Sequence, residues 1–166
     1  MVKMGGDKMN KNNVLDKKEI EYLQTLVRLD GLHKEMFGRK RNINLPVKFT
    51  ERICRKLLGL SEYKGKAFDA KDKNGGCTIE IKATCMPNPR TTFSREHEAD
   101  KYIWLKLVAE DNCIEIIELD KKEVEVAVHK DKTKRTRASV DLDNINGQNM
   151  LIRFNYINMT FEGDDN

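Results

Sequence analysis

The chain has 166 residues and a formal net charge of +4, and 39% of its residues are hydrophobic and 35% are charged. This balance is typical of a globular protein rather than a disordered one. No run of residues approaches the roughly 20 apolar residues that a membrane-spanning helix needs. The N-terminus is polar and lacks an apolar signal segment, so we expect a cytoplasmic protein.

We expect a single domain over residues 1–166, because one domain usually takes about 100 to 200 residues. Residues 1–13 and 163–166 contain mainly polar, charged and glycine residues and are predicted to be flexible. The four cysteines form no Cys-x-x-Cys pair, so the sequence does not predict a structural zinc site.

The first predicted element is a long amphipathic helix over residues 16–37. Asp16 and Glu19 have the spacing of a capping box, and apolar residues then recur at helical spacing. Gly38 follows, and glycine is the residue that most often ends a helix.

A second helix is predicted to begin at Pro46 or Thr50 and to end at Gly59. Its inner face should carry Ile53 and neighbouring leucines. Glu51 then lies in or near the first turn of this helix.

Two short strands are predicted to form a hairpin. They cover residues 66–70 and 77–83, and residues 71–76 between them contain an Asn-Gly-Gly turn. In the second strand, Ile79 and Ile81 alternate with polar residues, so one face should be buried and the other polar.

The rest of the chain should add strands to the same sheet. Residues 102–108 form the most apolar strand, which should be central, and residues 113–119 form another. Residues 86–94 hold two prolines and are predicted to be a loop, and one last strand is expected within residues 150–161. Residues 120–128 fit a short helix or an irregular strand. The predicted fold class is α/β, with a mixed central sheet of about four to five strands flanked by helices.

Three charged residues of the predicted hairpin point to chemistry. Asp69 closes the first strand and Glu80 lies on the second, so the hairpin should bring the two carboxylates side by side. Lys82, two residues beyond Glu80, projects from the same face. Carboxylate oxygens are the ligands that Mg²⁺ prefers. Because Glu-x-Lys on a strand is also common as a plain surface ion pair, a structural interpretation stays open beside the metal site.

The residues around this trio form a wider pattern: Phe68-Asp69, the glycine-rich turn, and the run Thr78-Ile79-Glu80-Ile81-Lys82-Ala83-Thr84. The pattern resembles the PD-(D/E)XK nuclease superfamily, especially its small type II restriction endonucleases. In that family an Asp at a strand end, an Asp or Glu on the next strand and a Lys two residues later form the metal site. Phe68 stands here where the family often has Pro.

The resemblance implies a restriction-endonuclease-like core that uses Mg²⁺ to hydrolyse phosphodiester bonds of double-stranded DNA at a short specific site. It assigns Asp69, Glu80 and Glu51 as ligands of one or two Mg²⁺ ions, and Lys82 as the residue that orients the attacking water. For Glu51 a second interpretation is open, because the helix dipole favours acids in a first turn without any metal. Cutting both strands of a symmetric site implies a homodimer.

Two polar segments are predicted to contact DNA. The first follows Lys82 and is rich in groups that bind phosphates and base edges, and we expect Arg90 to recognise a guanine. The second is a basic run that would neutralise phosphates. Plain solvated loops are the alternative interpretation of both segments. The predicted contacts are Asn88, Arg90, Thr91, Thr92, Ser94 and Arg95 in the first segment, and Lys130, Lys132, Lys134, Arg135 and Arg137 in the second.

The sequence therefore predicts a type II restriction endonuclease. One alternative is a structure-specific repair or junction nuclease of the same fold, which would prefer branched DNA to plain duplex. A second is a non-catalytic DNA-binding protein, which would bind duplex in Mg²⁺ without cutting it.

Overall fold

The computed structural model describes residues 15–38, 45–133 and 135–162. Residues 1–13 and 163–166, predicted to be flexible, lie outside the described residues. The helices of the described part are α1 (Lys17–Phe37), α2 (Val47–Leu58) and α3 (Lys121–Lys130), and short 3-10 turns lie at Ala109–Asp111 and Leu142–Asn144. Its strands are β1 (Ser61–Glu62), β2 (Ala70–Lys71), β3 (Thr78–Cys85), β4 (Arg90–Ser94), β5 (Lys101–Val108), β6 (Cys113–Leu119), β7 (Arg137–Asp141), β8 (Asn149–Asn155) and β9 (Thr160–Phe161).

The main sheet of the described residues has seven strands in the order β1-β2-β3-β5-β6-β8-β9. Strands β3 and β5 are parallel, and the other neighbours are antiparallel. The predicted mixed α/β architecture is confirmed, and β5 is the middle strand as expected. The predicted number of four to five strands was too small. The additional edge strands are only two residues long, and a two-residue pairing leaves no periodic pattern in a sequence.

Other boundaries also differ from the predictions. The segment predicted as a loop, residues 86–94, ends in strand β4, which pairs with β7 to form a separate two-stranded sheet. The undecided segment after β6 is helix α3, and the Asp120 side chain accepts a hydrogen bond from the amide of Glu123 at its N-terminus. The strand predicted at residues 66–70 is confined to Ala70–Lys71. The last predicted strand is divided into β8 and β9.

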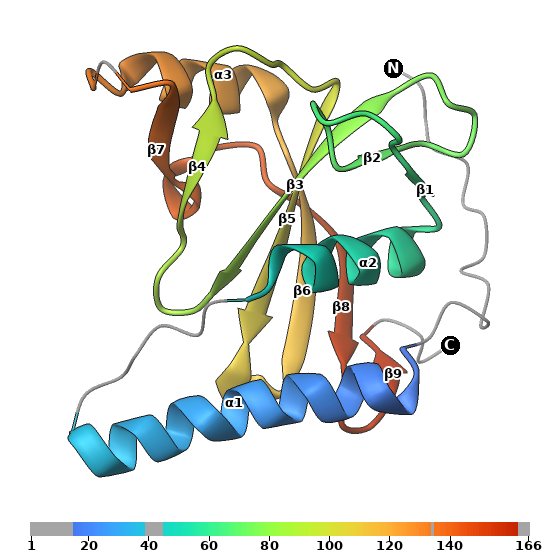
Figure 1. Cartoon of the computed structure of the whole chain (residues 1–166), viewed down its shortest axis with the longest axis vertical. Helices are drawn as coiled ribbons and strands as arrows, with labels where there is room; N and C mark the ends of the chain where they lie inside the picture. Colours follow the sequence, from blue (N-terminus) through green and yellow to red (C-terminus); the bar gives the residue numbers. More distant parts are fainter. Residues whose placement is uncertain (1–14, 39–44, 134, 163–166) are drawn as a thin grey trace.

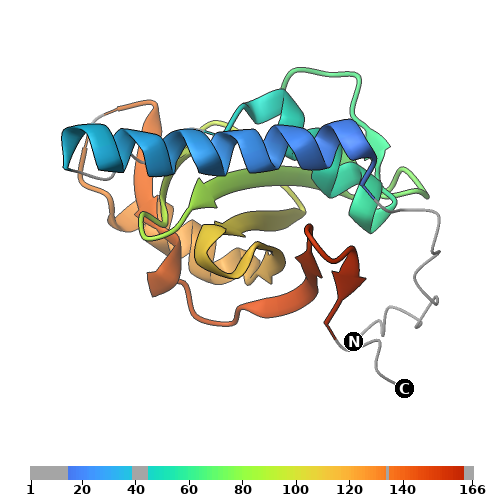
Figure 2. The ribbon, with the colours of Figure 1, turned by 90° about the horizontal axis from the view of Figure 1, so that it is seen from below.

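Two hydrophobic cores lie on opposite faces of the main sheet (Figures 1 and 2). On one face, α1 and α2 cover Ile79 and Ile81 of β3 together with apolar residues of β5 and β6. On the other face, α3, β4 and β7 enclose the fully buried Trp104. Alternate residues of β3 therefore meet different environments, as the alternation of the sequence predicted.

A buried carboxylate joins α1 to α2. The predicted capping box is confirmed: the Asp16 side chain accepts from the Glu19 amide, and the Glu19 side chain accepts from the Asp16 amide. The Glu19 side chain is only 5% exposed and also accepts from Arg52 at 2.9 Å and Lys56 at 2.7 Å. Because both cations belong to α2, this cluster fixes the position of the helix that carries Glu51.

The C-terminal half of α1 extends past the edge of the sheet (Figure 1). Four apolar residues of this half are largely exposed: Leu29, Leu32, Met36 and Phe37. The helix ends as predicted at Gly38, whose φ of 66° lies in the left-handed region that favours glycine. Among the described residues, no helix has the length and hydropathy needed to cross a membrane.

Replacing Glu19 tests the link between α1 and α2. Glu19→Ala should lower the free energy of unfolding by about 3 kcal/mol, because it breaks a buried ion pair and the reciprocal cap. Urea denaturation followed by circular dichroism measures the change. Glu21→Ala, an exposed acid on the same helix, should cost less than about 0.5 kcal/mol. Equal losses in the two variants would contradict the proposed role of Glu19.

Candidate functional site

Strand β3 places Glu80 and Lys82 next to each other on one face of the sheet. Their side chains form an ion pair with 2.5 Å between Nζ and Oε1, and each is 17% exposed. The ammonium of Lys82 also lies over the ring of Phe93, 5.4 Å from its centroid. Both contacts restrict the Lys82 side chain, so its charge is held at a defined point beside Glu80.

Asp69 lies directly before β2 and reaches across to β3. The β2–β3 register pairs Ala70 with Ile79, which brings Asp69 opposite the middle of β3. The Asp69 amide donates to the carbonyl of Ile79, and its carboxylate Oδ2 accepts from the amide of Ile81 at 2.7 Å. The carboxylate thus satisfies a strand amide at the point where the short β2 ends. It is therefore held at Ile81, the residue between Glu80 and Lys82 in the sequence of β3.

Glu51 approaches the same place from α2. The helix begins at Val47, so Glu51 lies beyond the first turn, where a helix dipole favours acids less. Its carboxylate is 3.6 Å from Nη1 of Arg55, and that nitrogen also donates to the carbonyl oxygen of Asp69. The Asp69 carboxylate is close enough for its charge to raise the pKa of Glu51. These three residues connect α2 to the segment before β2.

Glu51 and Glu80 have raised pKa values. Burial raises the pKa of Glu80; the charge of Lys82 opposes the shift, Asp69 adds to it, and Arg137 opposes it. Burial also raises the pKa of Glu51, the carboxylate of Asp69 adds to the shift, and Arg55 opposes it. Burial is thus the main cause of both shifts, and the charge of Asp69 adds to each of them.

The donor chemistry of this cluster fits a hard divalent cation. Within the described residues, no three or more His, Cys, Asp or Glu side chains are arranged as a ready metal cage. Mg²⁺ does not need one, because it is usually held by one or two carboxylates together with waters and substrate phosphates. Asp69 and Glu80 provide two such carboxylates. Lys82 and Arg137 each lower the pKa of Glu80, so positive charge at this place favours its ionised form.

Asp69, Glu80 and Lys82 lie in a cleft of about 670 Å³. One wall is formed by the start of α2 and residues 66–69, the floor by β3, and the other wall by β4 and the start of β7. Four residues predicted to contact DNA from the first segment line this cleft: Arg90, Thr91, Thr92 and Ser94. Arg137 is the member of the predicted basic segment that lines it. Glu51 is not among the residues that line this cleft.

The other predicted DNA contacts lie elsewhere. The Asn88 side chain accepts from the amide of Arg90 in the turn before β4. Lys130 and Lys132 line a second hollow between α3 and β7, and Arg135 is exposed in the connection between these elements. Lys134 lies outside the described residues.

Arg95 directs its guanidinium into the protein. Its nitrogens donate to the carbonyl of Val128 in the last turns of α3 and to three carbonyls of the segment that joins α3 to β7, those of Asp131, Thr133 and Arg135. A carboxylate oxygen of Asp131 lies 3.6 Å away. Arg95 therefore holds the basic segment in place.

Sequence reasoning did not select several residues of the cleft. Lys66, His97 and Thr136 line it with the predicted residues. The sequence around His97 is polar, and a histidine in a polar stretch is usually solvated. In the structure the centroid of its ring is 6.4 Å from that of Phe68. Thr136 directly precedes β7 and reaches the cleft because β7 pairs with β4, a pairing that no local pattern predicts.

An Asp at a strand end, Glu-x-Lys on the next strand and a mixed sheet flanked by helices define the general fold of the PD-(D/E)XK nucleases. A family model described as Bsp6I restriction endonuclease matches residues 11–140, well over half of the 166 residues. The chain therefore belongs to the Bsp6I restriction endonuclease family and is a type II restriction endonuclease, an enzyme that cleaves DNA. Comparison with curated proteins gives no match.

The raised pKa of Glu51 makes stability depend on pH. The folded protein binds the Glu51 proton more tightly than the unfolded chain, so this stabilisation is complete below the ordinary value of 4.5 and is lost as pH rises through the raised pKa. In metal-free solution, Glu51→Gln should therefore raise the free energy of unfolding at pH 8 and change it little at pH 4. Denaturant titrations at the two pH values measure this. Glu35→Gln, an exposed acid of α1, serves as control and should show no such difference.

Removing Arg95 should release the segment between α3 and β7. Charge-assisted hydrogen bonds contribute about 1.5 to 3 kcal/mol each, so Arg95→Ala should raise trypsin cleavage after Lys132 or Arg135 on the order of tenfold. Mass spectrometry of a proteolysis time course identifies the sites. Arg28→Ala, an exposed arginine of α1, should leave this cleavage unchanged. An unchanged rate in Arg95→Ala would show that other contacts hold the segment.

Proposed function

We propose that this enzyme hydrolyses phosphodiester bonds of double-stranded DNA at a short specific site, and that Mg²⁺ is its cofactor. Asp69, Glu80 and Lys82 form the catalytic centre. The observation that carries the proposal is the convergence of these three side chains in one cleft, in the pattern that resembles the PD-(D/E)XK superfamily. A cleft bordered by Arg90 and Arg137 also suits a polyanionic substrate.

Asp69 and Glu80 would hold the cation, with Glu51 as a further ligand or as the group that supports Asp69. One or two Mg²⁺ ions can be held this way, because phosphate oxygens and waters complete the coordination. When bound, Mg²⁺ lowers the pKa of a coordinated water and stabilises the negative charge that develops on the phosphodiester. The raised proton affinities of Glu51 and Glu80 support this assignment, since a cation would relieve the repulsion among the three carboxylates.

Lys82 would orient the attacking water and neutralise charge on the scissile phosphate. Its ammonium is held by Glu80 and the ring of Phe93, which restrict the side chain before DNA binds. Such a fixed charge needs little rearrangement when the transition state forms. The expected products carry a 5′-phosphate, as the resemblance to the superfamily implies.

A structure-specific repair or junction nuclease is the second candidate, because it would use the same catalytic residues. Cleavage of four-way junctions in preference to plain duplex of the same sequence would favour it. The non-catalytic alternative is disfavoured, since the family to which the chain belongs consists of endonucleases.

The proposal is tested by incubating plasmid and phage DNA with the purified protein in Mg²⁺ or in EDTA and sequencing the ends of the fragments. We expect discrete fragments with a common terminal sequence in Mg²⁺ alone. Asp69→Ala and Lys82→Ala should each lower the cleavage rate by at least about 100-fold, because each removes a group that acts on the developing charge.

Lys101→Ala is the matched control, since Lys101 also forms a strand ion pair, 3.6 Å from Glu118, outside the cleft. It should cut at the wild-type rate. Random fragment ends, or equal activity in EDTA, would contradict the proposed function.

We further propose that the enzyme is a homodimer and that the exposed apolar residues of α1 contribute to the contact between the two copies. Leu29, Leu32 and Met36 recur at helical spacing on the half of α1 that extends past the sheet, and a symmetric dimer pairs such a surface with itself.

Sedimentation velocity tests the dimer. The wild type should sediment as a dimer at micromolar concentration, and the double variant Leu29→Glu with Met36→Glu as a monomer, because burying unpaired charges opposes association. Gln24→Glu, an exposed position of the same helix, should remain dimeric. A monomeric wild type would refute the dimer, and a dimeric double variant would exclude this surface.

A further inference from the structure

Strands β4 and β7 form a two-stranded antiparallel ribbon that is separate from the main sheet. One face of this ribbon packs inward: Phe93 pairs with Ala138, Thr91 pairs with Val140, and three of these four residues are buried. The ribbon therefore has a fixed orientation, because its inner face belongs to the core around Trp104.

The other face of the ribbon is polar along its whole length. Its cross-strand pairs are Arg90 with Asp141, Thr92 with Ser139, and Ser94 with Arg137. All six side chains bear hydrogen-bonding groups, and four of them are exposed: Arg90, Thr92, Arg137 and Ser139. The Arg90 side chain is 66% exposed, and its ion pair with Asp141 is long at 4.0 Å, so its guanidinium is easily diverted to another acceptor.

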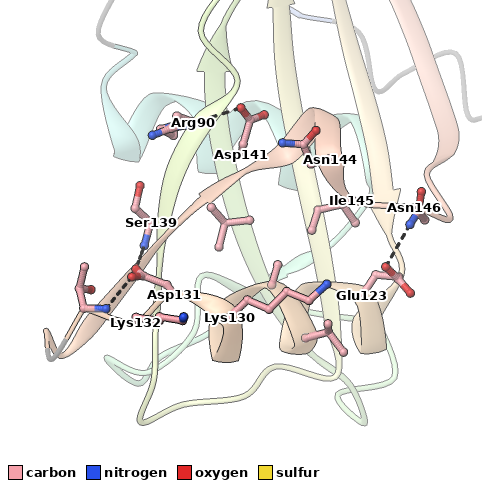
Figure 3. Close-up of a pocket in the computed structure, with 14 residues that line it drawn as sticks. Arg90, Glu123, Lys130, Asp131, Lys132, Ser139, Asp141, Asn144, Ile145 and Asn146 are labelled. Atoms are coloured by element: carbon pink, nitrogen blue, oxygen red, sulfur yellow. Dashed lines mark hydrogen bonds and ion pairs between the residues drawn. The ribbon is translucent and has the colours of Figure 1, made fainter.

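A hollow borders the ribbon on each side. The cleft with Asp69, Glu80 and Lys82 adjoins β4, and a groove of about 630 Å³ lies between β7 and α3 (Figure 3). Arg90 lines both hollows, so the ribbon forms a ridge between them. Lys130 and Lys132 line the α3–β7 groove.

The acids of the α3–β7 groove already have partners. Asp131 accepts from the amides of Thr133 and Ser139 and lies near Arg95, and the Glu123 carboxylate accepts from the side chain of Asn146 (Figure 3). The third acid, Asp141, accepts from the amide of Asp143 and lies 4.0 Å from Arg90. The two lysines of the groove are exposed. The groove therefore offers available positive charge, although its rim contains both signs.

We propose that the β4–β7 ribbon enters the major groove of duplex DNA and reads the base sequence there. The scissile strand would lie in the cleft, and the backbone of the complementary strand would lie in the α3–β7 groove. This inference rests on the proposed function and adds to it the element, the DNA groove and the side chains that give specificity. Ser139, which no sequence pattern selected, becomes a base-reading residue with Arg90 and Thr92.

The dimensions of the ribbon suit this placement. Two paired strands lie about 4.8 Å apart, and with their side chains they fit a major groove about 12 Å wide, which accepts a two-stranded ribbon. Four residue steps along a strand span about 14 Å, the rise of roughly four base pairs. The ribbon can therefore read several consecutive base pairs from a single position.

The position along the ribbon predicts the role of each side chain. Arg137 is the outward residue whose charge acts on Glu80, so it meets the phosphates beside the scissile bond. Arg90 lies at the opposite end of the ribbon and has the fork of donors that binds the O6 and N7 atoms of guanine. Thr92 and Ser139 face each other between them, where their hydroxyls meet base edges.

The test uses a pool of duplexes with randomised cores and the full-length Lys82→Ala protein, which should bind DNA without cutting it. Sequencing the bound duplexes gives the preferred sequence. Arg90→Ala and Thr92→Val, added to this background, should weaken binding of the selected duplex by about 5- to 150-fold, as loss of a base contact does. Binding of a scrambled duplex should change less than about twofold with Thr92→Val, since the threonine carries no charge.

The double variant Lys130→Ala with Lys132→Ala should weaken binding of the selected and the scrambled duplex equally. The slope of log affinity against log salt concentration should become shallower by about one to two. Lys122→Ala is the matched control, because Lys122 is an exposed lysine of α3 outside the groove, and it should change neither. Thr92→Val preserves side-chain shape at an exposed position, so it keeps the test valid if Arg90→Ala destabilises the protein.

Three results would overturn the proposal. The first is that no sequence is enriched in the bound pool, and the second is that Thr92→Val weakens binding of the selected and the scrambled duplex equally. The third is that neither Arg90→Ala nor Thr92→Val changes binding of the selected duplex. Wild-type cleavage in Mg²⁺, measured in parallel, separates this inference from the proposed function. If the wild type cuts specific sites and the ribbon variants cut them equally well, the proposed role of the ribbon is wrong and the proposed function stands. If binding is sequence-selective and depends on the ribbon but the wild type cuts no DNA in Mg²⁺, the proposed function is wrong and the role of the ribbon stands.

Discussion

The alternation of strand β3 is the constraint on which the rest of the candidate site depends. Ile79 and Ile81 are buried against α1 and α2, so Glu80 and Lys82 must face the opposite side. A shift of one residue would put both charges into an apolar core, which is far costlier than any surface ion pair is favourable. The hydrophobic core therefore fixes the charged pair, and the hydrogen bond from the Ile81 amide to Asp69 adds the third group.

The same arrangement concentrates negative charge. Glu51, Asp69 and Glu80 come from three different elements, and burial raises the pKa of two of them. Arg55 and Lys82 offset this charge only in part, and the Glu19 cluster holds α2 in place against the repulsion. Such local conflict with stability is typical of functional sites, where it is relieved by a ligand or used in chemistry.

The walls of the cleft depend on contacts between segments far apart in the chain. The β4–β7 ribbon closes one side. Arg95 links α3 to the connection that leads into β7, because it donates to one carbonyl of the helix and to three of the connection. Exposed charges on a well-packed scaffold are usual for binding surfaces, because rigidity lowers the entropy cost of contact. A change at Arg95 should therefore alter DNA binding through the ribbon without removing any direct contact.

The sequence by itself determined the features that depend on local periodicity and capping: the Asp16–Glu19 box, the end of α1 at Gly38, the faces of β3, and the apolar β5 in the middle of the sheet. It also provided the acid and lysine pattern that resembles the nuclease superfamily. Only the tertiary structure decided that residues 86–94 end in a strand, that this strand pairs with β7, and that the Arg95 guanidinium faces the protein. The two-residue strand β1 escaped prediction, and the last predicted strand was not divided into β8 and β9, for the same reason. Pairing between distant segments is selected by the packing of the whole chain, and a local pattern carries no record of its partner.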